Sequence, residues 1–214
     1  RETENIGLVV TDVVPLICAI AADVGVPCVA VRNFGWDVVF SDYLVAPQAT
    51  RGTSPARRAE LRRMVVQIAE DYARAVALLR LPGYVPTPAF SRIEDVPLVV
   101  RLARRPRQQV RAELGIPADC PGVALLLHGG HTVEMRPRAE WLPDGWWCVA
   151  CNGGRPLSAD EPLPAGWVLA AADVFTPDLV AAADVVVGKI GYGTASECLA
   201  HRTPLVFARR ELFN

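Results

Sequence analysis

A glycine-rich segment near the end of the chain has the residue types of an anion-binding turn. Residues 188–197 read Gly-Lys-Ile-Gly-Tyr-Gly-Thr-Ala-Ser-Glu and follow a run of three valines. Glycines let the backbone of such a turn approach a phosphate closely, and the free amides that begin the next helix can bind its oxygens. Thr194 and Ser196 add hydroxyl donors, and Lys189, the only lysine of the sequence, adds an ammonium group. The segment therefore predicts a turn that faces a phosphate or a sugar nucleotide.

Two other interpretations of the same segment remain open. Thr194 and Glu197 have the Thr-x-x-Glu spacing of a capping box, which satisfies the helix amides without any ligand. The segment also approaches the dinucleotide fingerprint, with Gly191, Gly193 and the acidic Glu211 further along the chain, although the third glycine is missing. The first interpretation is purely structural, and the second is that of a dinucleotide-binding oxidoreductase.

A second glycine pair follows a predicted buried strand at residues 122–127. Residues 128–131 read His-Gly-Gly-His, and the bare amides of Gly129 and Gly130 can contact an anion. Zinc is the alternative, but a zinc site needs more ligands than His128, His131 and the nearby Glu134 supply. We therefore expect backbone contacts to an anion here and no metal ion.

A third candidate site follows the strand predicted at residues 28–31. The stretch Asn33 to Asp37 offers two aromatic rings and a carboxylate to a sugar, or else begins a hydrophobic helix that Asn33 caps. Asp12, at the end of the first predicted strand, has the same ambiguity. A general base for group transfer is not singled out: Asp12, Asp37 and His131 are equal candidates.

Composition narrows the function classes. Lysine and arginine number 22 against 23 acidic residues, so no basic excess attracts nucleic acid. The apolar runs are too short to cross a membrane, and the first residues do not have the layout of a secretory signal. The six cysteines lie mostly in apolar segments, which fits reduced thiols and a cytoplasmic protein. Cys148 and Cys151 have redox spacing, but no helix follows to lower a thiol pKa.

The elements that must position these residues alternate between strand and helix, which predicts an α/β fold with parallel sheets. A helix after Asp12 turns Leu16, Ile17, Ile20 and Val24 to one face, and the longest helix covers 56–79. Proline clusters between 82 and 97 indicate a linker, so we place two Rossmann-like domains at 1–97 and 98–214. Further strands are expected at 6–10, 96–100, 147–150, 167–170, 185–187 and 205–208, with helices after Pro106 and at 176–183 and 194–201.

Motifs spread along the chain resemble the amino-terminal, glycosyltransferase-like region of L-arabinokinase-type proteins. They lie at residues 9–15, 33–37, 67–72, 80–84, 95–101, 175–179 and 188–194. The resemblance implies a GT-B fold, in which two Rossmann-like domains face a cleft and the second binds a UDP-sugar-like nucleotide. By motif, Gly191, Gly193, Thr194 and Ser196 would face the diphosphate, Glu197 the ribose hydroxyls, and Gly129 and Gly130 the phosphate from the opposite loop.

Comparison with the family pattern makes the chain look like a fragment in which both domains are incomplete. It begins after the family's first glycine- and histidine-rich loop, and the GHMP-type sugar kinase domain of the family has no counterpart in it. The leading hypothesis is a sugar-nucleotide-binding module that transfers a sugar to an acceptor without a metal ion, because helix amides and Lys189 neutralise the leaving diphosphate. The alternatives are a non-catalytic domain that regulates or scaffolds a fused sugar kinase, and the oxidoreductase domain above.

Overall fold

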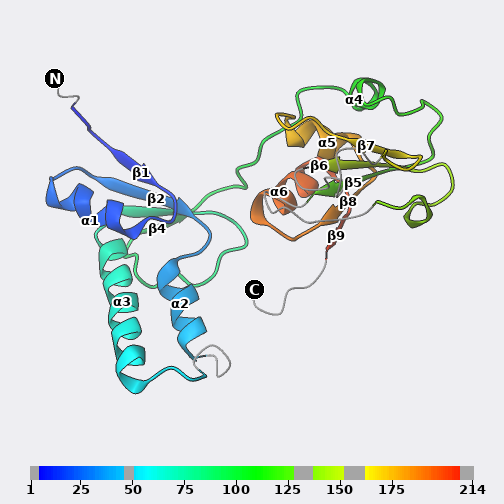
Figure 1. Ribbon diagram of the computed structural model, residues 1–214. Helices are drawn as coiled ribbons and strands as arrows, with labels where there is room; N and C mark the ends of the chain where they lie inside the picture. Colours follow the sequence, from blue (N-terminus) through cyan, green and yellow to red (C-terminus); the bar gives the residue numbers. More distant parts are fainter. Residues whose placement is uncertain (1–4, 46–50, 128–136, 152–161, 208–214) are drawn as a thin grey trace. The chain divides into compact units, whose positions relative to one another are not determined.

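The computed structural model describes residues 5–45, 51–127, 137–151 and 162–207. The chain divides into two compact units, Arg1–Leu98 and Val99–Asn214. Each unit contains one sheet in which every pairing is parallel (Figure 1). The predicted α/β class with two parallel sheets is confirmed. No helix in the described ranges is both long and apolar enough to cross a membrane.

The first unit has a four-stranded sheet in the order β1-β2-β3-β4. The strands are β1 (Val9–Thr11), β2 (Cys28–Arg32), β3 (Ala77–Arg80) and β4 (Ile93–Asp95), and the helices are α1 (Pro15–Asp23), α2 (Trp36–Val45) and α3 (Pro55–Ala73). Tyr72 from α3 and Leu78 from β3 are fully buried in its core, beside Phe90. Tyr72 therefore anchors the long helix α3 to the sheet.

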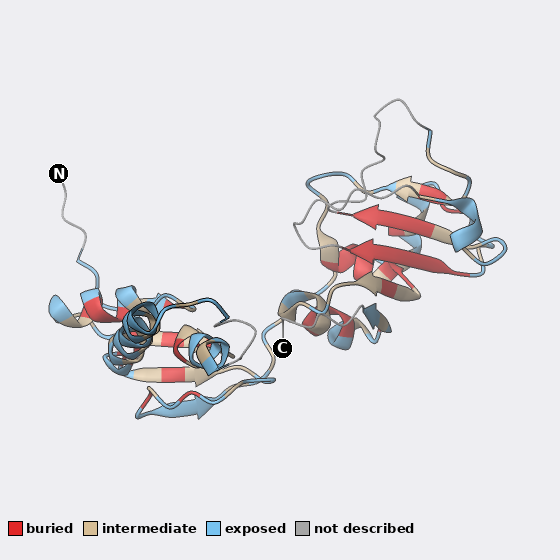
Figure 2. Ribbon diagram, turned by 60° about the horizontal axis from the view of Figure 1, so that its bottom comes forward, coloured by how far each residue is buried: buried red, intermediate tan, exposed pale blue. Residues whose placement is uncertain are grey.

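The second unit has a five-stranded sheet in the order β7-β6-β5-β8-β9. Its strands are β5 (Val123–Leu127), β6 (Trp147–Cys151), β7 (Trp167–Leu169), β8 (Val185–Gly188) and β9 (Leu205–Phe207). Its helices are α4 (Arg107–Glu113), α5 (Thr176–Ala182) and α6 (Tyr192–His201), with a 3-10 turn at Ala139–Trp141. Every residue of β5 is buried, as expected for a central parallel strand covered on both faces (Figure 2).

The longest helix is shorter than predicted. The prediction covers 56–79, whereas α3 ends at Ala73 and the residues from Ala77 to Arg80 form β3. Val29 to Arg32 pair with β3, so backbone bonds to a neighbouring strand override the helical spacing of the apolar residues. The stripe Leu61, Val65 and Ile68 is nevertheless half-buried, as that spacing predicts.

The strand predicted at 96–100 is also wrong. The strand at this point is β4, three residues earlier, and no strand forms at 96–100. Pro97 has no amide hydrogen for a sheet ladder, which explains why the strand ends before it. Instead, Asp95 closes β4 with a bidentate pair to Arg80 on β3, at 2.7 Å from Nε and 2.9 Å from Nη2.

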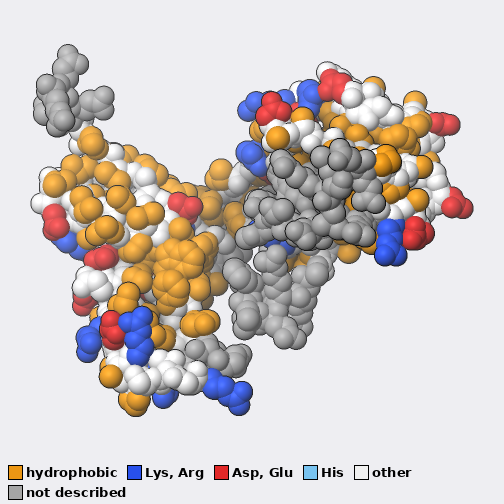
Figure 3. Space-filling model, viewed as in Figure 1, with side chains coloured by type: hydrophobic (Ala, Val, Ile, Leu, Met, Phe, Trp, Pro, Cys, Tyr) orange, Lys and Arg blue, Asp and Glu red, His pale blue; other side chains and the backbone are white. Residues whose placement is uncertain are grey.

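The buried face of α1 is the reverse of the predicted one. Leu16, Ile20 and Val24 are exposed, whereas the small residues Cys18, Ala19 and Ala21 are buried. Small side chains allow a helix to approach its neighbours closely, and α1 packs on α3 and β2 through them. Hydrophobic side chains consequently gather on the surface over α1 and β1 (Figure 3). Asp12 does not cap the helix, whose N-cap is Val14.

Candidate functional site

The predicted glycine-rich turn lies at the carboxyl end of β8, between that strand and α6. Gly188 pairs with Leu127 of β5, and a Cβ atom at Gly188 would lie 2.1 Å from the Leu127 carbonyl oxygen. Only glycine fits this close approach of two backbones. In parallel sheets, ligands bind beyond the carboxyl ends of the strands, so the turn occupies the edge where a ligand is expected.

The amino end of α6 has no side-chain cap. Its N-cap is Gly191, and no side chain in the described ranges bonds the amides of its first turn. The capping-box interpretation is therefore wrong, because the helix begins two residues before Thr194 and places that residue inside the first turn. A Cβ atom at Gly193 would meet nothing within 4 Å, so the space beside the first turn is open. The first amides of an α-helix lack intrahelical acceptors, so those of α6 can donate to a ligand.

The polar side chains of the turn differ in what they can offer to a ligand. Lys189 and Thr194 are half-exposed and accessible. Ser196 is buried, and its hydroxyl donates to the Tyr192 carbonyl oxygen at 2.7 Å. The structure therefore brings Lys189, Gly191, Gly193 and Thr194 together around the amino end of α6, whereas the Ser196 hydroxyl is engaged inside the helix.

Glu197 lies one turn further along α6 and is only 3% exposed. Arg101 donates two hydrogen bonds to its Oε1 atom, from Nε at 2.9 Å and from Nη2 at 2.6 Å. The same Nη2 donates to the Thr176 hydroxyl at 3.0 Å, at the start of α5. Sequence reasoning did not assign Arg101 to the site, and the one available signal was its place at the end of the motif 95–101.

The residues that follow Arg101 are hydrogen-bonded to side chains of α5 and α6. The Ala103 amide donates to His201 Nε2 at 2.9 Å, and His201 Nδ1 lies 2.8 Å from the Glu197 carbonyl oxygen. This arrangement requires the neutral tautomer of His201 with its proton on Nδ1, because Nε2 must accept. We call residues 101–105 the clasp segment.

Asp178 of α5 anchors the other end of the clasp segment. This carboxylate is 2% exposed and accepts bonds from the amides of Arg104 and Arg105 and from the Arg105 guanidinium. Burial acts to raise the pKa of Asp178, but these hydrogen bonds outweigh it and hold the pKa below its usual value. The clasp segment is therefore held by an ionised carboxylate at physiological pH.

In the first unit, the predicted stretch 33–37 packs against a buried arginine. Arg32 at the end of β2 is 1% exposed, and its guanidinium carbon lies 3.6 Å from the centre of the Tyr72 ring and 4.5 Å from that of Phe90. A Cβ atom at Gly35 would lie 2.3 Å from Asp37 Oδ1 and 2.8 Å from Arg32 Nη2. The loop can therefore pass over Arg32 and Asp37 only with glycine at position 35.

The two acidic candidates for a general base in this unit have opposite environments. Asp12 is exposed, whereas Asp37 is buried in the first turn of α2. Helix α2 begins at Trp36, so Asn33 is too far from the helix to cap it. The carbonyl oxygen of Asn33 instead accepts a hydrogen bond from the Val85 amide at 2.9 Å. Trp36 stacks on Phe40 and meets the edge of Phe34, which forms the aromatic cluster that the sequence suggests.

The two cysteines with redox spacing lie in surroundings that keep their thiols protonated. Cys148 and Cys151 lie in β6 and are buried. Burial raises the pKa of the Cys148 thiol to about 12 and that of Cys151 to about 11. Both thiols are therefore protonated and inert, in agreement with the interpretation as buried, reduced cysteines.

Several predicted residues lie outside the described residues. These are Gly129, Gly130 and His131, together with His128 and Glu211. The opposite phosphate loop, the zinc alternative and the acidic residue of the dinucleotide fingerprint therefore stay predictions. Among the residues that the structure does describe, no group of three side chains could hold a metal ion.

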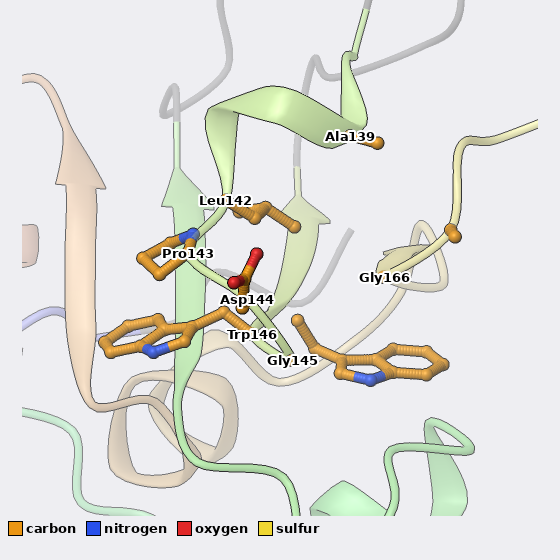
Figure 4. A pocket seen from close by; sticks show the side chains of 9 residues that line it. Ala139, Leu142, Pro143, Asp144, Gly145, Trp146 and Gly166 are labelled. Carbon is orange, nitrogen blue, oxygen red and sulfur yellow. The ribbon is translucent and has the colours of Figure 1, made fainter.

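A shallow pocket of about 370 Å³ lies elsewhere in the second unit (Figure 4). Its lining includes Asp144, Trp146, Trp147 and Gly166, which precede or begin β6 and β7. It therefore lies at the amino ends of the strands. The glycine-rich turn lies at their carboxyl ends, so this pocket is not part of the candidate site.

Comparison with known proteins bears directly on this geometry. No protein-family model matches the chain. Over 206 residues, 96% of its length, the chain is 44% identical to L-arabinokinase of Arabidopsis thaliana. The resemblance to L-arabinokinase-type proteins is confirmed. The chain spans only 18% of the length of that relative.

Solved structures identify the fold. The calicheamicin glycosyltransferase CalG4 superposes with a TM-score of 0.60 at 19% identity, over 94% of this chain and 56% of that one. The Arabidopsis thaliana protein UGT89C1, complexed with UDP-L-rhamnose, gives a TM-score of 0.56 at 12% identity, over 90% of this chain and 50% of that one. The chain thus has a GT-B fold, as predicted, and spans about half the length of these structures.

Proposed function

We propose that this chain is a GT-B-type region that binds a UDP-sugar at the amino end of α6. The open, uncapped first turn of that helix carries the proposal. Its amides and Lys189 would bind the diphosphate, because the helix amino end attracts anions and an ammonium group adds charge. Glu197, one turn further on, would accept from the ribose hydroxyls. A protein of the same fold is known in complex with UDP-L-rhamnose.

Transfer of the sugar to an acceptor would be the reaction of this region. The amides that bind the diphosphate would also stabilise it as it departs, when its negative charge grows. Such stabilisation is useful only if the donors are fixed before the reaction, and the backbone of a helix fixes them. In the first unit, Trp36 and Phe34 would offer aromatic rings to an acceptor sugar.

Titration of the protein with UDP by calorimetry tests this proposal. The informative variant is Gly193→Ala, because its new methyl group enters the open space beside the first turn without meeting another atom of the protein. We expect this variant to fold normally and to bind UDP at least about tenfold more weakly, which corresponds to about 1.4 kcal/mol. Gly7→Ala is the matched control, since Gly7 also lies in open space but in the other unit. Equal affinity in all three proteins would remove the proposed site.

A regulatory role beside a sugar kinase is the second candidate function. It is favoured by the burial of Asp37, because a transferase needs an accessible general base. Of the two described candidates for that base, Asp12 and Asp37, only Asp12 is exposed. In this case the region binds the nucleotide sugar and alters the activity of a fused GHMP-type kinase domain. Incubation with UDP-glucose and other UDP-sugars distinguishes the two, because transfer or hydrolysis releases UDP and pure regulation does not.

A further inference from the structure

The hydrogen bonds of Glu197 are unevenly distributed over its two carboxylate oxygens. Both bonds from Arg101 end on Oε1. No group in the described part of the chain donates to Oε2. A carboxylate oxygen can accept two hydrogen bonds, so among the described residues Oε2 keeps its full capacity. Arg101 therefore fixes the orientation of the carboxylate without occupying the second oxygen.

Arg101 itself is held in one orientation by groups other than Glu197. Its Nη2 atom donates to the Thr176 hydroxyl, and its guanidinium carbon lies 5.6 Å from the centre of the Phe175 ring. The planar guanidinium presents its donors in a rigid fork, so these contacts also fix the direction of the two bonds to Glu197. The side chain is nevertheless 61% exposed, which means that the core does not depend on it.

The clasp segment does not need Arg101 to stay attached to the second unit. Asp178 accepts three hydrogen bonds from Arg104 and Arg105, and His201 accepts one from Ala103. A role limited to anchoring would make Arg101 redundant with these bonds. Its distinct contribution is the orientation of the Glu197 carboxylate.

We propose that Arg101 is a positioning residue for nucleotide recognition: it holds Glu197 by Oε1 so that Oε2 accepts a hydrogen bond from a ribose hydroxyl of the nucleotide. This inference rests on the proposed function, because it concerns the same site. Recognition of the ribose is thereby coupled to the segment that enters the second unit from the first. A nucleotide without the 2′-hydroxyl loses part of this interaction.

The test compares the affinities for UDP and 2′-deoxy-UDP by calorimetry. A hydrogen bond to a charged group predicts that the wild-type protein prefers UDP by about tenfold or more. Arg101→Gln should reduce this preference to about threefold or less, and Glu197→Gln should do the same. In the double variant the two losses should not add, because both act through one interaction. Arg101→Lys, which keeps the charge but loses the fork, should give an intermediate preference.

Arg105→Gln is the matched control. Arg105 belongs to the same segment and bonds a buried carboxylate, but it does not contact Glu197. This variant should retain the full preference for UDP while its unfolding temperature falls. A merely structural role for Arg101 predicts instead that Arg101→Gln and Arg105→Gln behave alike.

The outcomes separate this inference from the proposed function. Full preference for UDP in Arg101→Gln overturns the inference and leaves the nucleotide site standing. Loss of the preference in Arg105→Gln also overturns it, because general anchoring of the clasp segment would then suffice. A wild-type protein that binds neither nucleotide overturns the proposed function, and the inference with it.

Discussion

Glu197 in the second unit and Arg32 in the first are both buried charged side chains, and they are held by different means. Glu197 in the second unit receives two directed hydrogen bonds from Arg101. Arg32 in the first unit rests on the rings of Tyr72 and Phe90. Within the described ranges, its guanidinium has no hydrogen-bond acceptor. Burial accordingly lowers the pKa of Arg32, although Tyr72 and Asp37 act in the opposite direction.

This difference shows what each kind of contact can fix. Hydrogen bonds are directional and determine where a carboxylate oxygen points, whereas ring stacking holds a cation over a face without aiming its donors. At these two positions, the second unit therefore fixes the direction of its buried charge, whereas the first unit packs its buried charge against rings. Substitutions in the two units should have correspondingly different effects.

The largest effect is expected in the second unit, at Asp178. Asp178→Ala removes the acceptor of three hydrogen bonds and leaves two amides of the clasp segment without a partner. We expect a loss of about 3 kcal/mol in the free energy of unfolding, measured by urea denaturation. Asp173→Ala, which removes an exposed carboxylate just before α5, should change it by less than about 0.5 kcal/mol. Similar losses in the two variants would contradict the assignment of the clasp.

The same carboxylate predicts how stability depends on pH. The pKa of Asp178 is lowered on folding, so its contribution is complete above the unfolded value near 3.8 and is lost as the pH falls through the lower folded value. Asp178→Asn removes this titration and should flatten the acid limb of the stability curve. Thermal unfolding followed between pH 2.5 and about pH 7 checks it. An acid limb as steep as that of the wild type would show that other groups control it.

A smaller effect is expected in the first unit, at Gly35. In Gly35→Ala the new Cβ atom collides with the side chains of Asp37 and Arg32, which are both enclosed and have little room to move. Overpacking of this kind should lower the free energy of unfolding by about 2 kcal/mol. Gly193→Ala in the second unit meets no atom and should leave the unfolding temperature within about 2 °C of the wild type. A fully stable Gly35→Ala protein would place the loop elsewhere.

The smallest effect is expected for Arg32→Met. The variant loses the stacking on Tyr72, worth about 2 kcal/mol in a buried setting, but it also removes the desolvation cost of an unpaired cation. Because the two changes offset each other, the free energy of unfolding should move by less than about 1 kcal/mol. A loss of 3 kcal/mol or more, measured by urea denaturation, would indicate that Arg32 has an ionic partner and that the two units hold their charges alike.

The sequence predicts the strands of the second unit well and those of the first unit less well. Buried parallel strands such as β5 and β6 are continuous apolar runs and stand out from their surroundings. In the first unit, β3 continues the helical spacing of α3, and β4 is an exposed triplet, Ile93–Asp95, with two acidic residues. Only pairing with β2 and β3 makes strands of these residues, and pairing is not visible in a single sequence.

The turn at the start of α6 was predictable because its glycines are themselves the chemical signal. The pairing of Glu197 with Arg101 was not, because the two residues are far apart in the chain and meet only after α5 and α6 have packed. The buried face of α1 was missed for a third reason: the helix is apolar all round, so size and not hydropathy decides which side chains are buried.

The most direct test of the account is the affinity of the protein for UDP before and after the substitution Glu197→Ala. We predict that UDP binds to the wild-type protein and that the substitution weakens binding at least about tenfold. Uracil and uridine, which lack the diphosphate, should give no comparable heat of binding with either protein. Equal affinity for UDP in the two proteins would contradict the claim that the first turns of α6 form the nucleotide site.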